Sequence, residues 1–160
     1  MPLAIELRVL DTASGCTPLE GAAVYAWHCD AQGRYSMYSS GVTDQNWLRG
    51  VQVTDADGVV RFTSIVPGCY AGRWPHVHFE VYPSVDAATS ASGKLATSQL
   101  AVPEDLCRSV YTDAAYTSSL GNLNGVSLQS DMVFRDGWSR ELATVSGTPE
   151  QQTWWFRQIT

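Results

Sequence analysis

The sequence predicts a mainly β protein, an antiparallel β-sandwich with one short helix. Short apolar and β-branched runs recur between turn residues, a spacing typical of sandwich strands. We expect strands at Leu3 to Leu10, Ala23 to Trp27, Val51 to Thr54, Val59 to Thr63, Val77 to Tyr82 and Ser98 to Val102. The run Asp55-Ala-Asp-Gly58 predicts a hairpin turn in which Gly58 takes a positive φ.

The one helix that we expect lies between Pro103 and Tyr116. Proline suits the first helical turn, where its missing N–H has no partner to lose, and the acidic pair that follows suits the positive end of the helix dipole. Further along, 122–126 has turn-like composition, 131–134 and 141–145 are strand candidates, and 154–156 is apolar. We expect residues 1–160 to form a single domain.

The charge of the chain argues against two classes of partner. The net charge is −6 and Lys94 is the single lysine, so the sequence has neither a basic stripe for nucleic acid nor a cationic face for a membrane. No stretch approaches the roughly 20 apolar residues that span a bilayer. We therefore expect no nucleic-acid partner and no membrane partner.

Four side chains form an unusual set of candidate metal donors, namely Tyr35, Tyr70, His76 and His78. The two histidines are two apart in an expected strand, so both point to one face. A phenol has a pKa of roughly 10 and is a poor ligand while protonated, so a site with two tyrosines needs a strongly charged ion. Hard phenolate with imidazole suits Fe(III) better than zinc, calcium or magnesium. We expect a non-haem Fe(III) site.

Several segments place these donors in a recognisable order. They are GAAVYAWH at 21–28, GRYS at 33–36, WLRG at 47–50, TDADG at 54–58 and PGCYAGRWPHVHF at 67–79. In this order they resemble the intradiol ring-cleavage dioxygenases, the family of catechol 1,2-dioxygenase and protocatechuate 3,4-dioxygenase. The similarity extends from about Leu7 to about Leu142. It implies the β-sandwich of that family.

The resemblance also implies a reaction and its ligands. The four donors would bind iron, and Tyr70 would be the axial ligand that is released when substrate arrives, opposite His76. The substrates would be a catechol-type aromatic and O2. The ring would open between its two hydroxylated carbons to give a cis,cis-muconate-type product.

Three residues carry catalytic roles in this interpretation: Arg73, Gln99 and Tyr70. A fixed guanidinium at Arg73 would stabilise negative charge that develops on the ring carbon. Gln99 would orient oxygen atoms by hydrogen bonds. The Tyr70 phenolate, on leaving the metal, would accept a proton from the catechol.

One departure from the larger cytoplasmic enzymes bears on the branch of the family. Only two residues separate Tyr70 from Arg73, where those enzymes carry a longer insertion. The short loop resembles the compact, often secreted branch, so we expect an exported enzyme. Its expected substrates are lignin-like or other plant-derived aromatics. A homodimer is a possible assembly. A cytoplasmic location is the less favoured alternative. The start of the sequence lacks signal-peptide features, and we expect an exported domain without its signal peptide.

The four cysteines form an even set in a small domain, as in disulfide frameworks. Spacing allows three pairings and cannot choose among them. We favour Cys16 with Cys29, which bracket a strand, and Cys69 with Cys107, which would pin the loop of Tyr70. The alternative is a set of four free thiols in a cytosolic enzyme.

Other interpretations of these residues stay open at this stage. Tyr38 competes with Tyr35 as the first tyrosine donor, and His28 is expected to be a packed histidine. Arg49 is expected to be a surface or ion-paired arginine. The His-x-His pair alone also suits zinc or copper. The competing function is a non-enzymatic transthyretin-like β-sandwich binding module.

Overall fold

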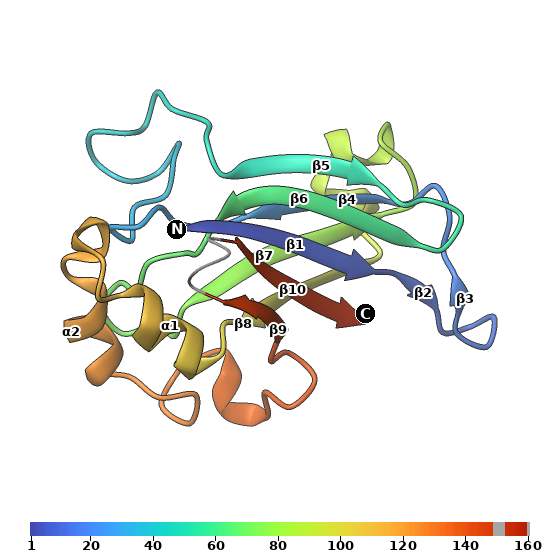
Figure 1. The fold of residues 1–160 in the computed structure, drawn as a ribbon. Coiled ribbons are helices and arrows are strands. Elements are labelled where there is room, and N and C mark those ends of the chain that lie inside the picture. Colours follow the sequence, from blue (N-terminus) through green and yellow to red (C-terminus); the bar gives the residue numbers. More distant parts are fainter. Residues whose placement is uncertain (149–152, 160) are drawn as a thin grey trace.

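The computed structural model describes residues 1–148 and 153–159, and its strands form two facing sheets (Figure 1). One sheet has the order β6-β1-β10-β9, and the other has the order β5-β4-β7-β8. The strands of the first are β1 Pro2–Arg8, β6 Val59–Ile65, β9 Thr144–Thr148 and β10 Thr153–Ile159. Those of the second are β4 Ala23–Trp27, β5 Arg49–Val53, β7 His76–Tyr82 and β8 Ala96–Ala101.

The remaining elements are short. A small ladder joins β2 Leu10–Asp11 and β3 Thr17–Pro18, and the helices are α1 Glu104–Val110 and α2 Ser119–Asn124. Single 3-10 turns occur at Ala87–Thr89, Ala91–Gly93, Ala114–Tyr116 and Phe134–Asp136. The helices lie together beyond one end of the sandwich, and β2 and β3 lie at the other end (Figure 1). None of the helices in the described ranges is long and apolar enough to cross a membrane.

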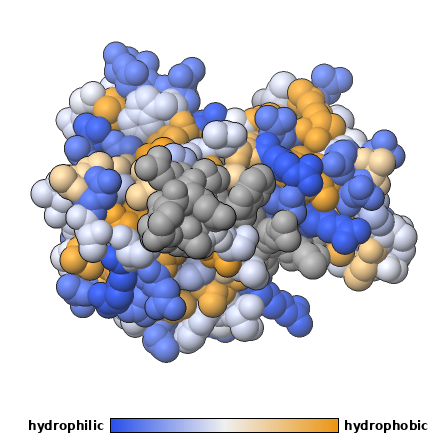
Figure 2. Space-filling view, viewed as in Figure 1, coloured by the Kyte–Doolittle hydropathy of each residue, from blue (hydrophilic) through white to orange (hydrophobic). Residues whose placement is uncertain are grey.

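The core lies between the two sheets. In β1 the inward-facing residues are Leu3, Ile5 and Leu7, each at most 2% exposed, and they alternate with residues that face out. The opposing sheet contributes Val77 and Phe79 of β7 to the same cluster. Outside, apolar and hydrophilic residues are interspersed on the face shown in Figure 2. The alternation of buried and exposed residues along β1 is what the periodicity of a strand predicts.

The predicted β-sandwich and its strands from 3 to 102 are confirmed. β4 has the predicted bounds, and β7 begins at His76, one residue earlier than expected, so both histidines of the pair lie in the strand. The expected strand at 3–10 divides into β1 and β2. β1 pairs parallel with β10, and the other ladders are antiparallel.

The predicted turn before β6 forms, but it is not a hairpin within one sheet. Gly58 has φ +74°, and a Cβ there would lie 2.5 Å from the carbonyl oxygen of Val9. The Asp55 carboxylate accepts hydrogen bonds from the N–H groups of Asp57 and Val59. Because β5 and β6 belong to different sheets, this turn carries the chain from one layer to the other. Both strands end up at sheet edges.

The prediction of a single helix was wrong, because the turn-like segment 122–126 partly belongs to α2. Contacts distant in sequence stabilise this six-residue helix: the Asn122 side chain donates to the Cys69 carbonyl at 2.8 Å, and Ser119 Oγ accepts from the Cys69 N–H at 3.0 Å. Helices this short depend on tertiary packing rather than on local propensity. The helix cues between Pro103 and Tyr116 correspond to α1, which ends at Val110.

The strand predicted at 131–134 is also wrong. The Asp131 side chain accepts hydrogen bonds from the N–H groups of Val133 and Phe134, which closes a turn instead of extending the chain. The candidate at 141–145 is displaced, since β9 begins at Thr144 and Leu142 forms only an isolated bridge with Ala101. The apolar run 154–156 lies within β10.

The structure does not contain the favoured disulfides, because all four cysteines are free thiols. Cys16 is exposed and precedes β3, whereas Cys29 is buried beyond the far end of β4. The five residues of β4 alone span about 16 Å, well beyond the separation that a disulfide bridges. Cys69 and Cys107 are both buried, and Cys69 is near enough to raise the pKa of Cys107, but they are not bonded.

Candidate metal centre

The donors of β7 and of the loop before β5 converge on one point. Since side chains alternate along a strand, His76 and His78 point to the same face, and their Nε2 atoms lie 3.0 Å apart. Val77 between them points into the core and is fully buried. The Tyr35 hydroxyl lies 3.2 Å from each Nε2 atom. Three donor atoms from two distant segments thus form a nearly equilateral triangle.

The size of this triangle fits a shared metal ion. Ligand atoms about 2.1 Å from one ion, at angles of about 90–100° to each other, lie about 3.0–3.2 Å apart. Such angles are typical of neighbouring positions in five- or six-coordinate sites. Across residues 1–148 and 153–159 no group of three or more histidine, cysteine and acidic residues is placed to hold a metal. The Tyr35 oxygen is the side-chain donor that lies within 3.2 Å of both histidines.

Tyr70 lies at the same centre, in the loop before β7. Its ring meets the Tyr35 ring edge-on at a centroid distance of 5.8 Å and the His76 ring at 5.9 Å. The two phenols are close enough for each to influence the pKa of the other. The structure thus brings together all four donors that the sequence singles out.

The hydrogen bonds of His76 prepare its ring for metal binding. Its Nδ1 atom contacts the Trp74 carbonyl oxygen, which only accepts hydrogen bonds, so Nδ1 carries the proton and Nε2 presents a lone pair to the centre. Burial lowers the pKa of His76 to about 3. For His78, burial and then the positive charge of Arg73 lower the pKa to about 4. Both rings are therefore neutral at pH 7 and able to bind a cation.

The two tyrosines, in contrast, must lose a proton before they can bind a cation well. Burial raises the pKa of Tyr35 far above its ordinary value and also raises that of Tyr70. Neither group ionises near neutral pH unless a strong positive charge is bound beside it. The donor set thus fits a trivalent ion such as Fe(III), which is able to displace both phenolic protons.

Arg73 reaches the centre from the Tyr70 loop and is held from two sides. Its Nε donates to Asp131 at 2.9 Å, and its Nη2 donates to the Gln99 Oε1 atom at 2.7 Å. Gln99 lies in β8 directly opposite His78 of β7. The positive charge of Arg73 acts on the ionisation of the tyrosine and histidine donors, which places it beside them. The two predicted catalytic residues are therefore neighbours of the donors and of each other.

Asp131 is the member of this site that sequence analysis missed. Its side chain is fully buried and also accepts from the Trp74 N–H at 2.6 Å. Burial alone would raise its pKa, but the hydrogen bonds from Trp74 and Arg73 hold the pKa below its ordinary value, so the carboxylate is ionised. An aspartate that accepts hydrogen bonds from backbone N–H groups two and three residues later is typical of turns, so the turn at Asp131 has a local cue in the sequence. Its pairing with Arg73 has no signal in the sequence.

Comparisons with known proteins agree with this arrangement. A family model described as Dioxygenase matches residues 1–76, a range that includes Tyr35, Tyr70, Arg73 and His76. A chlorocatechol 1,2-dioxygenase of Rhodococcus opacus is 42% identical over 62 residues, which is 39% of this chain and 23% of that protein. The protocatechuate 3,4-dioxygenase beta chain of Burkholderia cepacia is 36% identical over 86 residues, 47% of this chain and 36% of that one. The chain thus matches well under half the length of these relatives.

Solved structures extend the likeness across the whole chain. An intradiol ring-cleavage dioxygenase from Tetranychus urticae has a TM-score of 0.81 at 22% identity and covers 99% of this chain and 79% of its own. The dioxygenase domain of a carbohydrate-binding fusion from Streptomyces sp. SirexAA-E has a TM-score of 0.61 at 26% identity, with coverage of 99% and 79%. These matches support the intradiol dioxygenase family for this chain.

Arg49 holds the Tyr35 segment in place. Its Nη2 donates to the Ser36 carbonyl at 2.7 Å, and its Nε donates to the Ser36 hydroxyl at 3.0 Å. Its Nη1 donates to the Tyr25 hydroxyl at 3.0 Å. The expectation of a surface or ion-paired arginine was wrong. Tyr38 is 72% exposed beneath the Arg49 guanidinium, so Tyr35 is the tyrosine that faces the centre.

The neighbours of His78 are aromatic. Trp27 stacks on the His78 ring at 4.7 Å with an interplanar angle of 6°, and Tyr25 stacks on Trp27 at 4.9 Å. This stack fixes the orientation of the His78 ring. His28, which follows Trp27 in the sequence, is buried and hydrogen bonded to Cys29 and Ser64. It does not point to the centre, as expected of a packed histidine.

The loops that carry Tyr35 and Tyr70 contact each other at two glycines. Gly33 has φ +81°, and a Cβ there would lie only 2.9 Å from the Tyr70 Cβ. A Cβ at Gly68 would lie 2.6 Å from the Ala31 carbonyl oxygen. Both positions therefore require glycine, because the backbone of the loop before Tyr35 packs directly on the loop that ends at Tyr70.

Proposed function

We propose that this chain is a non-haem Fe(III)-dependent oxidoreductase, an intradiol dioxygenase that uses O2 to open catechol-type rings between their two hydroxylated carbons. The products would be of the cis,cis-muconate type. The observation that carries this proposal is the triangle of Tyr35, His76 and His78 donor atoms, with sides of 3.0–3.2 Å and Tyr70 beside it. The matches to the intradiol dioxygenase family support the same reaction class.

The donor set explains which protons the chain moves. Ferric iron, when bound, supplies the charge that ionises the phenols and the electron acceptor that makes a chelated catecholate reactive towards O2. A catechol bound through both oxygens would lose two protons: the Tyr70 oxygen would be the protein group that accepts one of them, and the second would pass to water. Tyr35 is the phenol that stays, because its oxygen lies against both histidines and its segment is held by Arg49.

Arg73 and Gln99 act on the substrate in this proposal. Asp131 and Gln99 fix the direction of the guanidinium before substrate binds. Preorganised positive charge stabilises negative charge that develops on the ring carbon. Since Gln99 accepts from Arg73 through Oε1, its amide nitrogen remains a donor that can orient a substrate oxygen.

The substrate class follows from one neighbour as well as from the site. The Streptomyces structure is a dioxygenase domain of a carbohydrate-binding fusion protein in a cellulolytic bacterium. This context supports plant-derived catechols, such as lignin fragments, as substrates of the present chain, and with them an exported location. The location is a proposal that the free cysteines do not support.

Oxygen uptake tests the proposal directly. Iron-loaded protein is expected to consume O2 with catechol and to yield a product with the absorbance of a cis,cis-muconate, and a panel of substituted catechols would rank its substrates. A protein that folds, binds no iron, stays colourless and ignores catechol under O2 would favour the transthyretin-like binding module. The convergence of two phenols and two imidazoles favours the enzyme, since a binding module has no need of it.

A further inference from the structure

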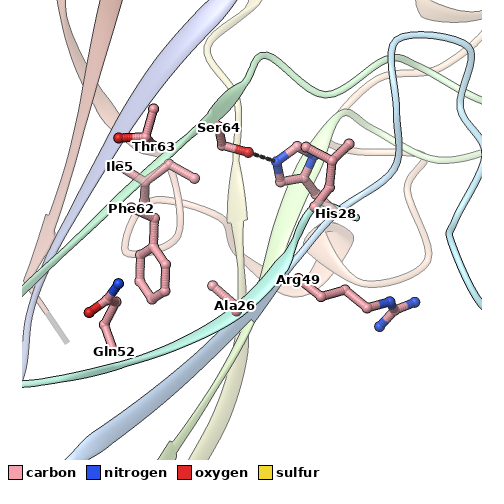
Figure 3. Close-up of a pocket in the computed structure, with 10 residues that line it drawn as sticks. Ile5, Ala26, His28, Arg49, Gln52, Phe62, Thr63 and Ser64 are labelled. Atoms are coloured by element: carbon pink, nitrogen blue, oxygen red, sulfur yellow. Dashed lines mark hydrogen bonds between the residues drawn. The ribbon is translucent and has the colours of Figure 1, made fainter. Parts of the chain in front are cut away.

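A second site lies away from the donors, between the edge strands of the two sheets. A cavity of about 250 Å³ opens there between β5 and β6 (Figure 3). It is lined by Ile5, Ala26, His28, Leu48, Arg49, Gly50, Gln52, Phe62, Thr63 and Ser64. None of these residues is one of the four metal donors. The cavity exists because the chain crosses between sheets after β5 and leaves both strands with one unpaired edge.

The hydrogen bonds of His28 determine which way a proton points in this cavity. Its Nδ1 lies 2.7 Å from the Cys29 carbonyl oxygen, which only accepts, so Nδ1 must carry the ring proton. The ring is 3% exposed, and burial lowers its pKa to about 4, so it is neutral. Nε2 is then an acceptor, and the Ser64 hydroxyl donates to it at 2.6 Å. Because the Ser64 proton is committed, its oxygen can only accept a hydrogen bond from a ligand.

The rest of the lining consists of apolar residues, of Arg49, which is already paired, and of two exposed polar residues, Gln52 and Thr63. Ile5, Ala26 and Phe62 supply apolar surface, with the Phe62 side chain directed into the opening (Figure 3). The Arg49 guanidinium points away from the opening and is bonded to Ser36 and Tyr25. None of the lining residues is acidic. A ligand complementary to Ser64 and to the apolar residues is therefore uncharged, with an apolar body and a hydroxyl that donates to Ser64.

We infer that this cavity binds a small uncharged phenol, with its ring against Phe62 and its hydroxyl donating to Ser64. A phenol combines a flat apolar ring with a stronger hydroxyl donor than an aliphatic alcohol has. The iron centre, by contrast, requires two adjacent hydroxyls on its substrate. Monophenols are thus ligands of this site without being substrates of the other.

The same pair of residues does not favour hydrolysis. A serine bonded to a histidine that is oriented by a third group has the outline of a nucleophile and its base. However, His28 is too weak a base at neutral pH to accept the serine proton efficiently. In addition, the side chains of the lining offer no pair of fixed donors aimed at the oxygen of a tetrahedral intermediate. Recognition is the role that fits.

The first test compares two ligands that differ in one hydrogen-bond donor. Iron-loaded full chain is titrated with 4-fluorophenol and with 4-fluoroanisole, and binding is followed by fluorine NMR. The phenol is expected to bind saturably and at least about threefold more tightly, the effect of one neutral hydrogen bond. Equal binding of the two ligands, or no saturable binding of the phenol, overturns the inference.

The second test closes the cavity from two sides. Ser64→Val removes the acceptor and covers His28, and Gly50→Val adds bulk towards Phe62, because a Cβ at Gly50 would lie 4.0 Å from that ring. Valine suits a strand at both positions. Ser146→Val, on the exposed side of β9, is the matched control.

Each cavity variant is expected to weaken 4-fluorophenol binding at least about tenfold, whereas the control leaves binding unchanged. Near-UV circular dichroism and iron content show whether each variant retains its fold and its metal. Full binding in both folded cavity variants places the phenol elsewhere, for instance at the iron, and refutes the site. Because the probe has a single hydroxyl and is not turned over, the result does not depend on ring cleavage.

Discussion

Asp131 accepts a hydrogen bond from Arg73 at 2.9 Å across 58 residues of sequence, and the aspartate is fully buried. The pair joins the turn after α2 to the loop that carries Tyr70. A guanidinium held by a buried carboxylate keeps one direction, so the position of Arg73 at the centre depends on a residue that does not itself touch the donors. This dependence leads to the first prediction.

Asp131→Asn is expected to lower kcat/KM for catechol by about 10- to 100-fold, the loss that follows from misplacing a catalytic group by about 1 Å. The amide keeps an acceptor for the turn but loses the charge that holds Arg73. Steady-state oxygen uptake measures the effect, and iron content and colour should remain. Asp136→Asn, at an exposed position nearby, is the control. An unchanged kcat/KM in a folded Asp131→Asn protein would show that Arg73 is positioned without it.

Tyr35→Phe removes the oxygen that lies 3.2 Å from both imidazoles. With a phenolate lost, the protein should bind less iron, and the wine-red absorption expected from phenolate-to-iron charge transfer should weaken or shift. Visible spectra and metal analysis measure both effects. Tyr38→Phe, at the exposed neighbouring tyrosine, should leave them unchanged. Identical spectra for the two variants would exclude Tyr35 as a ligand.

Arg73→Ala separates the electrostatic role from metal binding. The arginine is a neighbour of the donors and not itself a donor, so the variant should keep its colour and its iron. Turnover of catechol should fall by about 100-fold or more, as when one preorganised donor is removed from an active site. The visible absorption band reports whether iron is still bound, and oxygen uptake reports the rate of catechol turnover. Full turnover in the variant would refute the charge role.

The three histidines make the metal-free protein sensitive to mild acid. Burial lowers the folded-state pKa of His76 to about 3, and those of His28 and His78 to about 4. In the unfolded chain each takes up a proton near pH 6.5. Between about pH 4 and 6.5 the unfolded state therefore binds more protons than the folded state. The contribution of the neutral histidines to the free energy of unfolding is fully present above about pH 6.5 and is lost as the pH decreases.

Each histidine contributes at most about 1.4 kcal/mol of destabilisation per pH unit. Urea unfolding of metal-free protein at several values between about pH 7.5 and 5 would measure the slope before the carboxylates titrate. The free energy of unfolding should decline steadily below about pH 6.5. A flat profile would mean that the folded protein protonates these rings without cost.

Thiol labelling tests the state of the cysteines. Cys16 is exposed, whereas Cys29, Cys69 and Cys107 are buried. Burial raises the pKa of Cys29 and of Cys69 to about 12 and raises that of Cys107 as well, so few thiolates are present near neutral pH. In the native protein only Cys16 should react quickly with a thiol reagent. Four reactive thiols should appear on unfolding without reductant, and only two or none would point to disulfides.

Local sequence patterns accounted for the strands but not for the segments that depend on distant partners. The bounds of β4 follow from alternating apolar residues and flanking turns, which are local properties. α2 and the turn at Asp131 are set by hydrogen bonds to Cys69, Arg73 and Trp74, all far away in sequence. No window along the chain contains that information.

The same division holds for the site. The period of a strand is enough to place His76 and His78 on one face, and the structure confirms that placement. The approach of Tyr35 and Tyr70 was expected from their donor chemistry and from a resemblance to known proteins, and no periodicity indicates it, because loops bring them in. Asp131 and the supporting bonds of Arg49 were missed, since a buried ion pair and a side chain bonded to a backbone carbonyl leave no periodic trace. The ligand roles themselves remain predictions until metal is bound and measured.

The contact through Gly33 has a consequence for engineering this protein. Any larger residue there would displace the loop that carries the Tyr70 phenol, and the loop of Tyr35 would have to shift with it. Libraries that vary one of these loops alone would therefore be expected to contain few metal-competent members. Paired randomisation of both loops, with Gly33 and Gly68 retained, offers a shorter route to altered substrate preference.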